Sequence, residues 1–126
     1  FTGYVNIHEY MASLDFTVLT SISEGQPLAL IESMAAKRPV VATNVGACRE
    51  LIEGDAGDTL GHAGFCVPPM DQTGLLKAMV DLCRNANKRN QMGKVGQVSA
   101  EAYYKENQMI ANYKRVYKKA IERWQE

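Results

Sequence analysis

The spacing of hydrophobic and polar residues changes repeatedly along the first 70 residues, and each change predicts a new element. Three short runs rich in β-branched and aromatic residues predict buried strands. They are residues 16–19, 39–43 and 64–69. Helical spacing follows Asn6, continues from Pro27 to Arg38, and returns in a shorter segment that Gly54 ends. We expect Pro27 at the first helical position, where its missing N–H costs nothing.

From Asp71 to the end of the sequence the pattern is helical, with an interruption at the polar stretch 85–91. The last predicted helix has a wide apolar face, and its lysines lie off that face. The members of the face are Met109, Ile110, Tyr113, Val116, Tyr117, Ala120, Ile121 and Trp124. This face can pack on the sheet, cover a partner domain or, where no partner covers it, promote self-association.

The predicted fold class is α/β, a partial doubly wound parallel sheet with helices on both faces, followed by C-terminal helices. We expect one domain over residues 1–126, with a sheet region at 1–70 and a helical region at 71–126. Three strands are fewer than such a sheet usually holds, so further strands are expected upstream of residue 1.

The composition is typical of a soluble globular domain, with 46% hydrophobic and 22% charged residues. The 14 bases balance the 14 acids, so net charge gives no argument for nucleic acid as a partner. The balance hides a gradient, because residues 1–83 carry a net charge of −6 and residues 84–126 one of +6. The basic segment is either a solvated face or a surface for a membrane or an acidic partner.

The cysteines and the lack of long apolar runs favour a cytoplasmic protein. Cys48, Cys66 and Cys83 are odd in number and widely spaced, without a C-x-x-C pair for zinc or redox chemistry. A reducing compartment is the simplest inference. No run approaches the roughly 20 apolar residues that span a bilayer, and the first ten residues do not resemble a signal peptide.

The segment between the first predicted strand and the helix after it is the candidate for chemistry. Ligands of doubly wound sheets bind at the carboxyl ends of strands, against helix N-termini whose N–H groups suit a phosphate. Gly25 allows the backbone to approach a ligand closely. Glu24 stands just before the helix, and Glu32 lies roughly 7–8 Å along its axis and leans back toward its start. Two carboxylates that bracket an anion site fit a ligand with hydroxyls on both sides of a diphosphate, such as a nucleotide sugar.

Each glutamate also has an ordinary explanation. Glu24 can complement the helix dipole, and Glu32 can be a solvated residue beside a base. Neither metal nor another cofactor is expected, because His8 and His62 are isolated from other ligands along the sequence.

The same segment carries a family resemblance. Glu24, seven intervening residues and Glu32 form an E-x7-E motif. Two further motifs come after it, G-x-x-x-E beginning at Gly46 and G-F-C-V-P-P-x-D beginning at Gly64. In this order and spacing the motifs resemble those of retaining glycosyltransferases of the large family 4 type, which have two facing Rossmann-like domains. The resemblance covers residues 1–83 well and the later helices only in pattern. The form SISEGQPLALIESMAA is similar to the cytosolic glycosyltransferases of Pel exopolysaccharide systems.

The resemblance implies a role for each candidate residue. Glu32 would hydrogen-bond the ribose hydroxyls of the donor, and Glu24 would position the donor sugar at the reacting end. The N–H groups of Gln26 and Leu28, beside the permissive Gly25, would face the sugar and the diphosphate. Such enzymes generally need no metal, because the helix dipole and basic side chains neutralise the leaving diphosphate.

The chain departs from the family pattern in two ways. Gln26-Pro27 replaces the Phe-Gly of the common E-G-F-G-L, which removes one N–H donor and adds a side-chain amide. The Arg and Lys that grip the diphosphate in the family, and its acceptor domain, would lie upstream. These 126 residues alone are therefore expected to bind donor weakly and to be inactive.

The expected function is donor binding for transfer of a hexose from a nucleotide diphosphate sugar in exopolysaccharide synthesis, with UDP-glucose suggested by the Pel-like form. The expected partners are the nucleotide sugar, an N-terminal acceptor domain of the same protein and a membrane-bound component of polysaccharide synthesis. Two alternatives remain open: a nucleotide-sugar 2-epimerase on the same scaffold, and a flavodoxin-like regulatory module. The latter needs an acidic cluster after the first strand and a lysine after the last, and neither is visible.

Overall fold

The computed structural model describes residues 3–54 and 59–124. Its centre is a parallel sheet in the order β1-β2-β3, formed by Thr17–Leu19, Val40–Thr43 and Gly64–Val67. In the register of the sheet, Val41 pairs with Val18 on one side and with Phe65 on the other. The three predicted strands are confirmed, with ends that differ from the prediction by one or two residues.

The helices follow the predicted order. They are α1 (Ile7–Met11), α2 (Leu28–Ala35), α3 (Cys48–Glu53), α4 (Gln72–Arg84), α5 (Ala86–Tyr103) and α6 (Glu106–Trp124). Asn6 caps α1 as predicted, because its side chain accepts a hydrogen bond from the N–H of His8 at 3.3 Å. The predicted interruption at 85–91 is confined to Asn85, whose side chain accepts from the N–H of Lys88 and so begins α5.

Helix α2 ends at Ala35, three residues before the predicted end at Arg38. Lys37 adopts a φ of 61°, the left-handed conformation that terminates many helices. The N–H of Lys37 then donates to the carbonyl of Met34 at 3.0 Å, and that of Arg38 to the carbonyl of Ser33 at 2.9 Å. These two bonds close the last turn, so Pro39 stands beyond the end of the helix.

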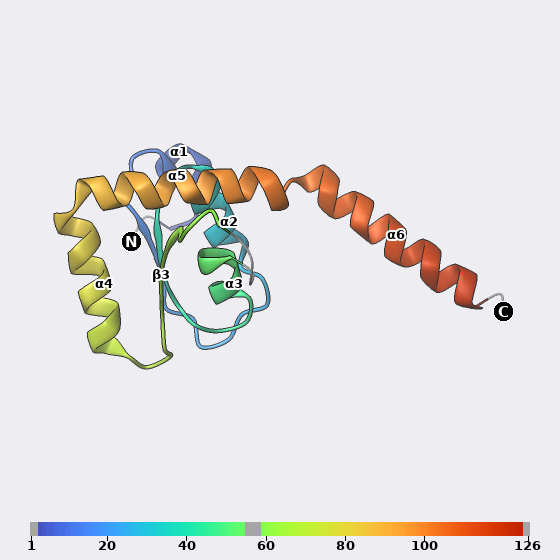
Figure 1. The fold of residues 1–126 in the computed structure, drawn as a ribbon, viewed down its shortest axis with the longest axis horizontal. Helices are drawn as coiled ribbons and strands as arrows, with labels where there is room; N and C mark the ends of the chain where they lie inside the picture. Colours follow the sequence, from blue (N-terminus) through green and yellow to red (C-terminus); the bar gives the residue numbers. More distant parts are fainter. Residues whose placement is uncertain (1–2, 55–58, 125–126) are drawn as a thin grey trace.

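Helices cover both faces of the sheet, as predicted (Figure 1). Helices α2 and α3 supply the core on one face, where Leu30, Met34 and Ile52 are buried against β2. Helix α4 covers the other face, where Leu82 packs with Val41. Burial of these side chains is the main force that holds the layers together.

Helix α5 crosses the amino end of the sheet. A Cβ on Gly93 would overlap the carbonyl oxygen of Lys37, just before β2, and one on Gly96 would lie 3.2 Å from Met34 and 3.3 Å from Ala63. Glycine is therefore required at position 93 for the helix to come this close, and Gly96 avoids a tight contact with the two side chains. The opposite, carboxyl end of the sheet is where the loops that follow the strands gather (Figure 1).

Helix α6 projects away from this body (Figure 1). None of its residues is buried, and each of its large apolar residues is at least 43% exposed. The alternative that this face packs on the chain's own sheet is therefore wrong. No helix in the described residues is both long and apolar enough to cross a bilayer.

Candidate functional site

The loop between β1 and α2 is held at the carboxyl end of the sheet by hydrogen bonds. The hydroxyl of Ser21 donates to a carboxylate oxygen of Glu24 at 2.6 Å, which orients this half-buried side chain. The hydroxyl of Thr43, at the end of β2, donates to the carbonyl of Ser21 at 2.6 Å. Thr43 is 7% exposed, so this bond ties the loop firmly to the sheet.

A second loop, between β2 and α3, presses against the first. Gly46 has a φ of 52°, and a Cβ on it would lie 2.5 Å from the carbonyl oxygen of Gly25 and closer still to that of Glu24. The N–H of Ala47 donates to the same carbonyl of Gly25 at 2.8 Å. Residue 46 must therefore be glycine for Glu24 and Gly25 to keep their positions.

Helix α2 begins with its N-terminus uncapped by any side chain. Pro27 takes the N-cap position with an extended backbone, and Leu28 is the first helical residue. The prediction that Pro27 is the first helical residue is therefore wrong by one position, because its ψ of 116° is not helical. The N–H of Leu30 donates to the carbonyl of Pro27 at 3.2 Å, while those of Leu28 and Ala29 have no partner among the described residues and are left to water or a ligand.

The two glutamates occupy different settings. Glu24 lies in the loop, bonded to Ser21, while Glu32 lies in the second turn of α2 and is also half-buried. The carboxylate of Glu32 has no hydrogen bond or ion pair within the residues the structure describes. The ordinary explanation that Glu32 is paired with a base does not hold among those residues.

Gly25 is exposed, and a Cβ placed on it would meet no atom within 4 Å. The space in front of the loop is thus open to a ligand. The nearby thiol of Cys48, at the start of α3, is buried, and burial raises its pKa, with a further rise from the charge of Glu24. Burial likewise raises the pKa of the Cys66 thiol in β3. All three cysteines are free.

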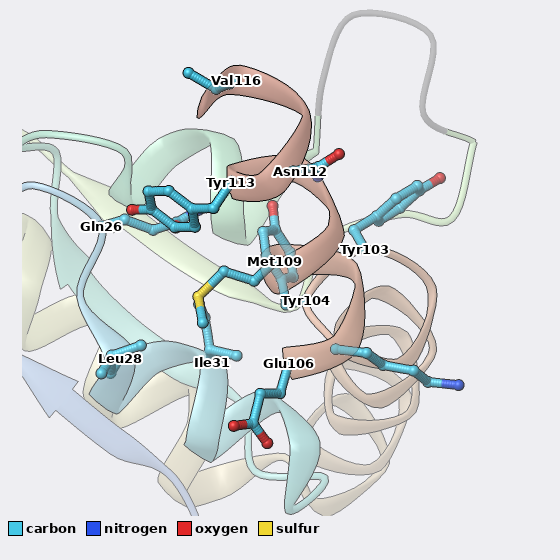
Figure 2. Close-up of a pocket in the computed structure, with 11 residues that line it drawn as sticks. Gln26, Leu28, Ile31, Tyr103, Tyr104, Glu106, Met109, Asn112, Tyr113 and Val116 are labelled. Carbon is cyan, nitrogen blue, oxygen red and sulfur yellow. The ribbon is translucent and has the colours of Figure 1, made fainter. Parts of the chain in front are cut away.

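Gln26 and Leu28 line a groove of about 410 Å³ between the start of α2 and the junction of α5 with α6. The remaining lining residues are Ile31, Tyr103, Tyr104, Lys105, Glu106, Met109, Asn112, Tyr113 and Val116. Figure 2 shows Met109 and Tyr113 pointing from α6 toward the α2 side of the groove. Glu24, Gly25 and Glu32 do not line it, so the five candidate residues fall into two adjoining surfaces.

A smaller hollow of about 150 Å³ lies where all three strands end, between Thr20, Thr43 and the segment that follows β3. Asp71 borders it and caps α4, accepting a hydrogen bond from the N–H of Gly74 at 2.8 Å. Among the described residues, no three His, Cys, Asp or Glu side chains gather closely enough to hold a metal ion. His8 and His62 are both exposed.

Sequence reasoning missed the residues that hold the loop in place. Ser21 and Thr43 carry no motif, and only their hydrogen bonds identify them. Gly46 was visible as part of G-x-x-x-E, but its contact with the carbonyls of residues 24 and 25 joins positions more than 20 apart in sequence.

The sequence that forms these two loops and the start of α2 matches a known family. The family described as glycosyl transferases group 1 matches residues 1–85. The chain belongs to this family. The match covers the residues that carry the E-x7-E and later motifs, and it disfavours the flavodoxin-like regulatory module.

Individual relatives agree with the family. The chain is 28% identical over 112 residues to N-acetyl-alpha-D-glucosaminyl L-malate synthase of Bacillus anthracis, covering 89% of this chain and 28% of that protein. It is 40% identical over 78 residues to the lipopolysaccharide core biosynthesis mannosyltransferase LpsB of Rhizobium meliloti, covering 62% of this chain and 20% of that protein.

A solved structure shares the fold. Sucrose-phosphate synthase from Thermosynechococcus elongatus superposes with a TM-score of 0.76 at 23% identity, covering 89% of this chain and 27% of that one. This likeness confirms the predicted α/β fold class. The chain spans less than a third of the length of each of these three proteins.

Proposed function

We propose that this chain binds the donor, a nucleotide diphosphate sugar, for a retaining glycosyltransferase. The observation that carries the proposal is Glu32, a half-buried residue whose carboxylate has no partner among the described residues and which lies in a helix whose N-terminus no side chain caps. Both features call for a polar ligand or water, because unpaired charges and N–H groups are costly to desolvate. Family membership supports a glycosyl donor as that ligand.

Each candidate residue is assigned a separate role in donor binding. Glu32, inside the helix, accepts hydrogen bonds from the ribose hydroxyls of the donor. Glu24, oriented by Ser21, contacts the hydroxyls of the donor sugar and stabilises positive charge that develops at its reacting carbon. The N–H groups of Gln26 and Leu28 face the sugar and the diphosphate, where the positive end of the α2 dipole favours the departing anion. Gly25 leaves the space in front of the loop open.

The finer assignment is a UDP-hexose donor used without a metal ion, in the synthesis of an exopolysaccharide. The resemblance to Pel-type glycosyltransferases supports the donor, and a relative named for lipopolysaccharide core biosynthesis supports a role in surface polysaccharides. Basic side chains elsewhere in the enzyme complete the neutralisation of the diphosphate. The three free thiols support a cytoplasmic location.

The test is a titration of the isotope-labelled chain with UDP, UDP-glucose and GDP-mannose, followed by backbone amide NMR shifts. Shifts should gather at residues 23–28 and at Glu32. Replacing Glu32 with Gln should weaken UDP and UDP-glucose alike by about 10- to 100-fold, since a charge-assisted hydrogen bond contributes roughly 1.5–3 kcal/mol. Replacing Glu24 with Gln should weaken UDP-glucose but not UDP, because only the former carries the sugar.

Glu101→Gln is the matched control, because Glu101 is an exposed helical glutamate on α5, outside the candidate site. It should leave all three affinities unchanged. Saturating shifts that lie elsewhere on the chain, or a Glu32→Gln variant that binds UDP as tightly as the original, would refute the proposal.

A further inference from the structure

We propose that Ser21 is a positioning residue for the donor sugar, which acts on that sugar through Glu24 alone. The inference rests on the proposed function, because it takes Glu24 as the residue that contacts the sugar. Its basis is the 2.6 Å hydrogen bond from the Ser21 hydroxyl to a carboxylate oxygen of Glu24. Hydrogen bonds of this length from a hydroxyl to an ionised carboxylate are among the strong ones in proteins. The bond therefore holds the carboxylate in one orientation before any ligand arrives.

The second oxygen of the Glu24 carboxylate remains available. Ser21 donates to Oε1, while Oε2 has no partner within the residues that the structure describes. Glu24 is half-buried, and the space in front of the neighbouring Gly25 is open. We therefore assign Oε2 to a hydroxyl of the donor sugar. Ser21 has a single hydroxyl hydrogen, which its bond to Glu24 uses, so it cannot at the same time donate to the sugar.

Ser21 can orient Glu24 because its own main chain is fixed. The hydroxyl of the buried Thr43, at the carboxyl end of β2, donates to the Ser21 carbonyl at 2.6 Å. On the other side of Glu24, the N–H of Ala47 donates to the carbonyl of Gly25 at 2.8 Å. The end of β2 and the loop after it thus hold the backbone before and after Glu24, and the Ser21 hydroxyl extends this support to the side chain.

Loss of the Ser21 hydroxyl should affect the sugar and not the nucleotide. The Glu24 side chain would then be free to rotate and would have to be ordered when the sugar binds, which weakens binding by about 2- to 10-fold. UDP carries no sugar at this position, so its affinity should stay the same. A purely structural role would weaken both ligands, because the N–H groups of Gln26 and Leu28, which we assign to the sugar and the diphosphate, follow on the same loop.

The test compares two hydroxyl deletions in this loop by NMR titration of the labelled chain with UDP and with UDP-glucose. Ser21→Ala should weaken UDP-glucose by about 2- to 10-fold and leave UDP unchanged. Ser23→Ala is the matched control, because Ser23 is exposed and lies two residues further along, and it should change neither affinity. A double-mutant cycle tests the route through Glu24: in a Glu24→Ala chain, Ser21→Ala should cause no further loss.

A measurement without ligand tests the orientation of Glu24 directly. Three-bond scalar couplings to the β-protons of Glu24 should report one χ1 rotamer in the original chain and in Ser23→Ala, and an average over rotamers in Ser21→Ala. Urea denaturation checks that each variant is folded. If the original chain bound neither UDP nor UDP-glucose, the proposed donor function would fail, while these couplings would still decide whether Ser21 positions Glu24.

Three results would overturn the inference. The first is a Glu24 side chain that already averages over rotamers in the original chain. The second is a Ser21→Ala variant that loses affinity for UDP as much as for UDP-glucose, which would indicate a structural role. The third is a further loss of UDP-glucose affinity when Ser21→Ala is added to Glu24→Ala, which would mean that Ser21 contacts the sugar itself.

Discussion

Replacing Gly46 with Ala tests whether the β2–α3 loop holds the candidate donor loop in place. A methyl group there would lie 2.5 Å from the carbonyl oxygen of Gly25 and closer to that of Glu24. Residue 46 would also have to keep a φ of 52°, which costs a non-glycine residue about 1 kcal/mol. Relief of the overlap must separate the two loops and break the 2.8 Å bond from the N–H of Ala47 to Gly25, a loss of about 1 kcal/mol.

With residual steric strain, the free energy of unfolding of Gly46→Ala should fall by about 2–4 kcal/mol. Urea denaturation followed by circular dichroism measures this change. The amide NMR signals of Glu24 and Gly25 should move even where the variant remains folded, and affinity for UDP-glucose should decrease with them.

Gly25→Ala is the matched control, because it adds the same methyl group in the same pair of loops but in open space. Its free energy of unfolding should stay within about 0.5 kcal/mol of the original. If Gly46→Ala proves as stable as Gly25→Ala, with the amide signals of residues 24 and 25 unmoved, then the contact between the loops does not position Glu24.

Other predictions follow from single side chains. Leu82→Ala should lower the free energy of unfolding by about 3 kcal/mol in urea denaturation, because Leu82 of α4 is fully buried against the sheet. Leu76→Ala should cost well under about 1 kcal/mol, because Leu76 of the same helix is 61% exposed. Thr43→Val should cost about 1–2 kcal/mol by the same measurement, since it leaves a loop carbonyl without its donor; an unchanged midpoint would show that water replaces the hydroxyl. Cys83, which is exposed, should react with a thiol reagent before Cys66, whose pKa is raised by burial, and equal reaction rates would contradict this order. Because the folded state holds the Cys66 thiol in its neutral form, the free energy of unfolding should fall as alkaline pH rises through the folded-state pKa of Cys66.

Much of the fold follows from local patterns in the sequence. Strand positions are visible because short β-branched runs differ in period from the helical segments around them. The parallel arrangement follows from the alternation of the two, and the register then places the loops after β1 and β2 at one end of the sheet. The candidate glutamates were likewise visible, because their spacing is a property of one helix and the short loop before it.

Several features were decided only in three dimensions. The left-handed Lys37 that ends α2 has no sequence signal, because glycine is the usual residue at such a position and lysine adopts it only where the surrounding packing compensates.

The bond from Thr43 to the Ser21 carbonyl, and the closeness of Gly46 to residues 24 and 25, join segments whose proximity depends on the pairing of β1 with β2. The sequence of α6 determined that one face would be apolar and the other basic. The sequence did not determine whether the apolar face of α6 lies in the core. Both faces of the sheet are already covered by other helices where α5 ends, so none of the core is left for α6 to complete. Local periodicity determines the elements and their exposed chemistry, while contacts between distant segments determine which surfaces are left for ligands and partners.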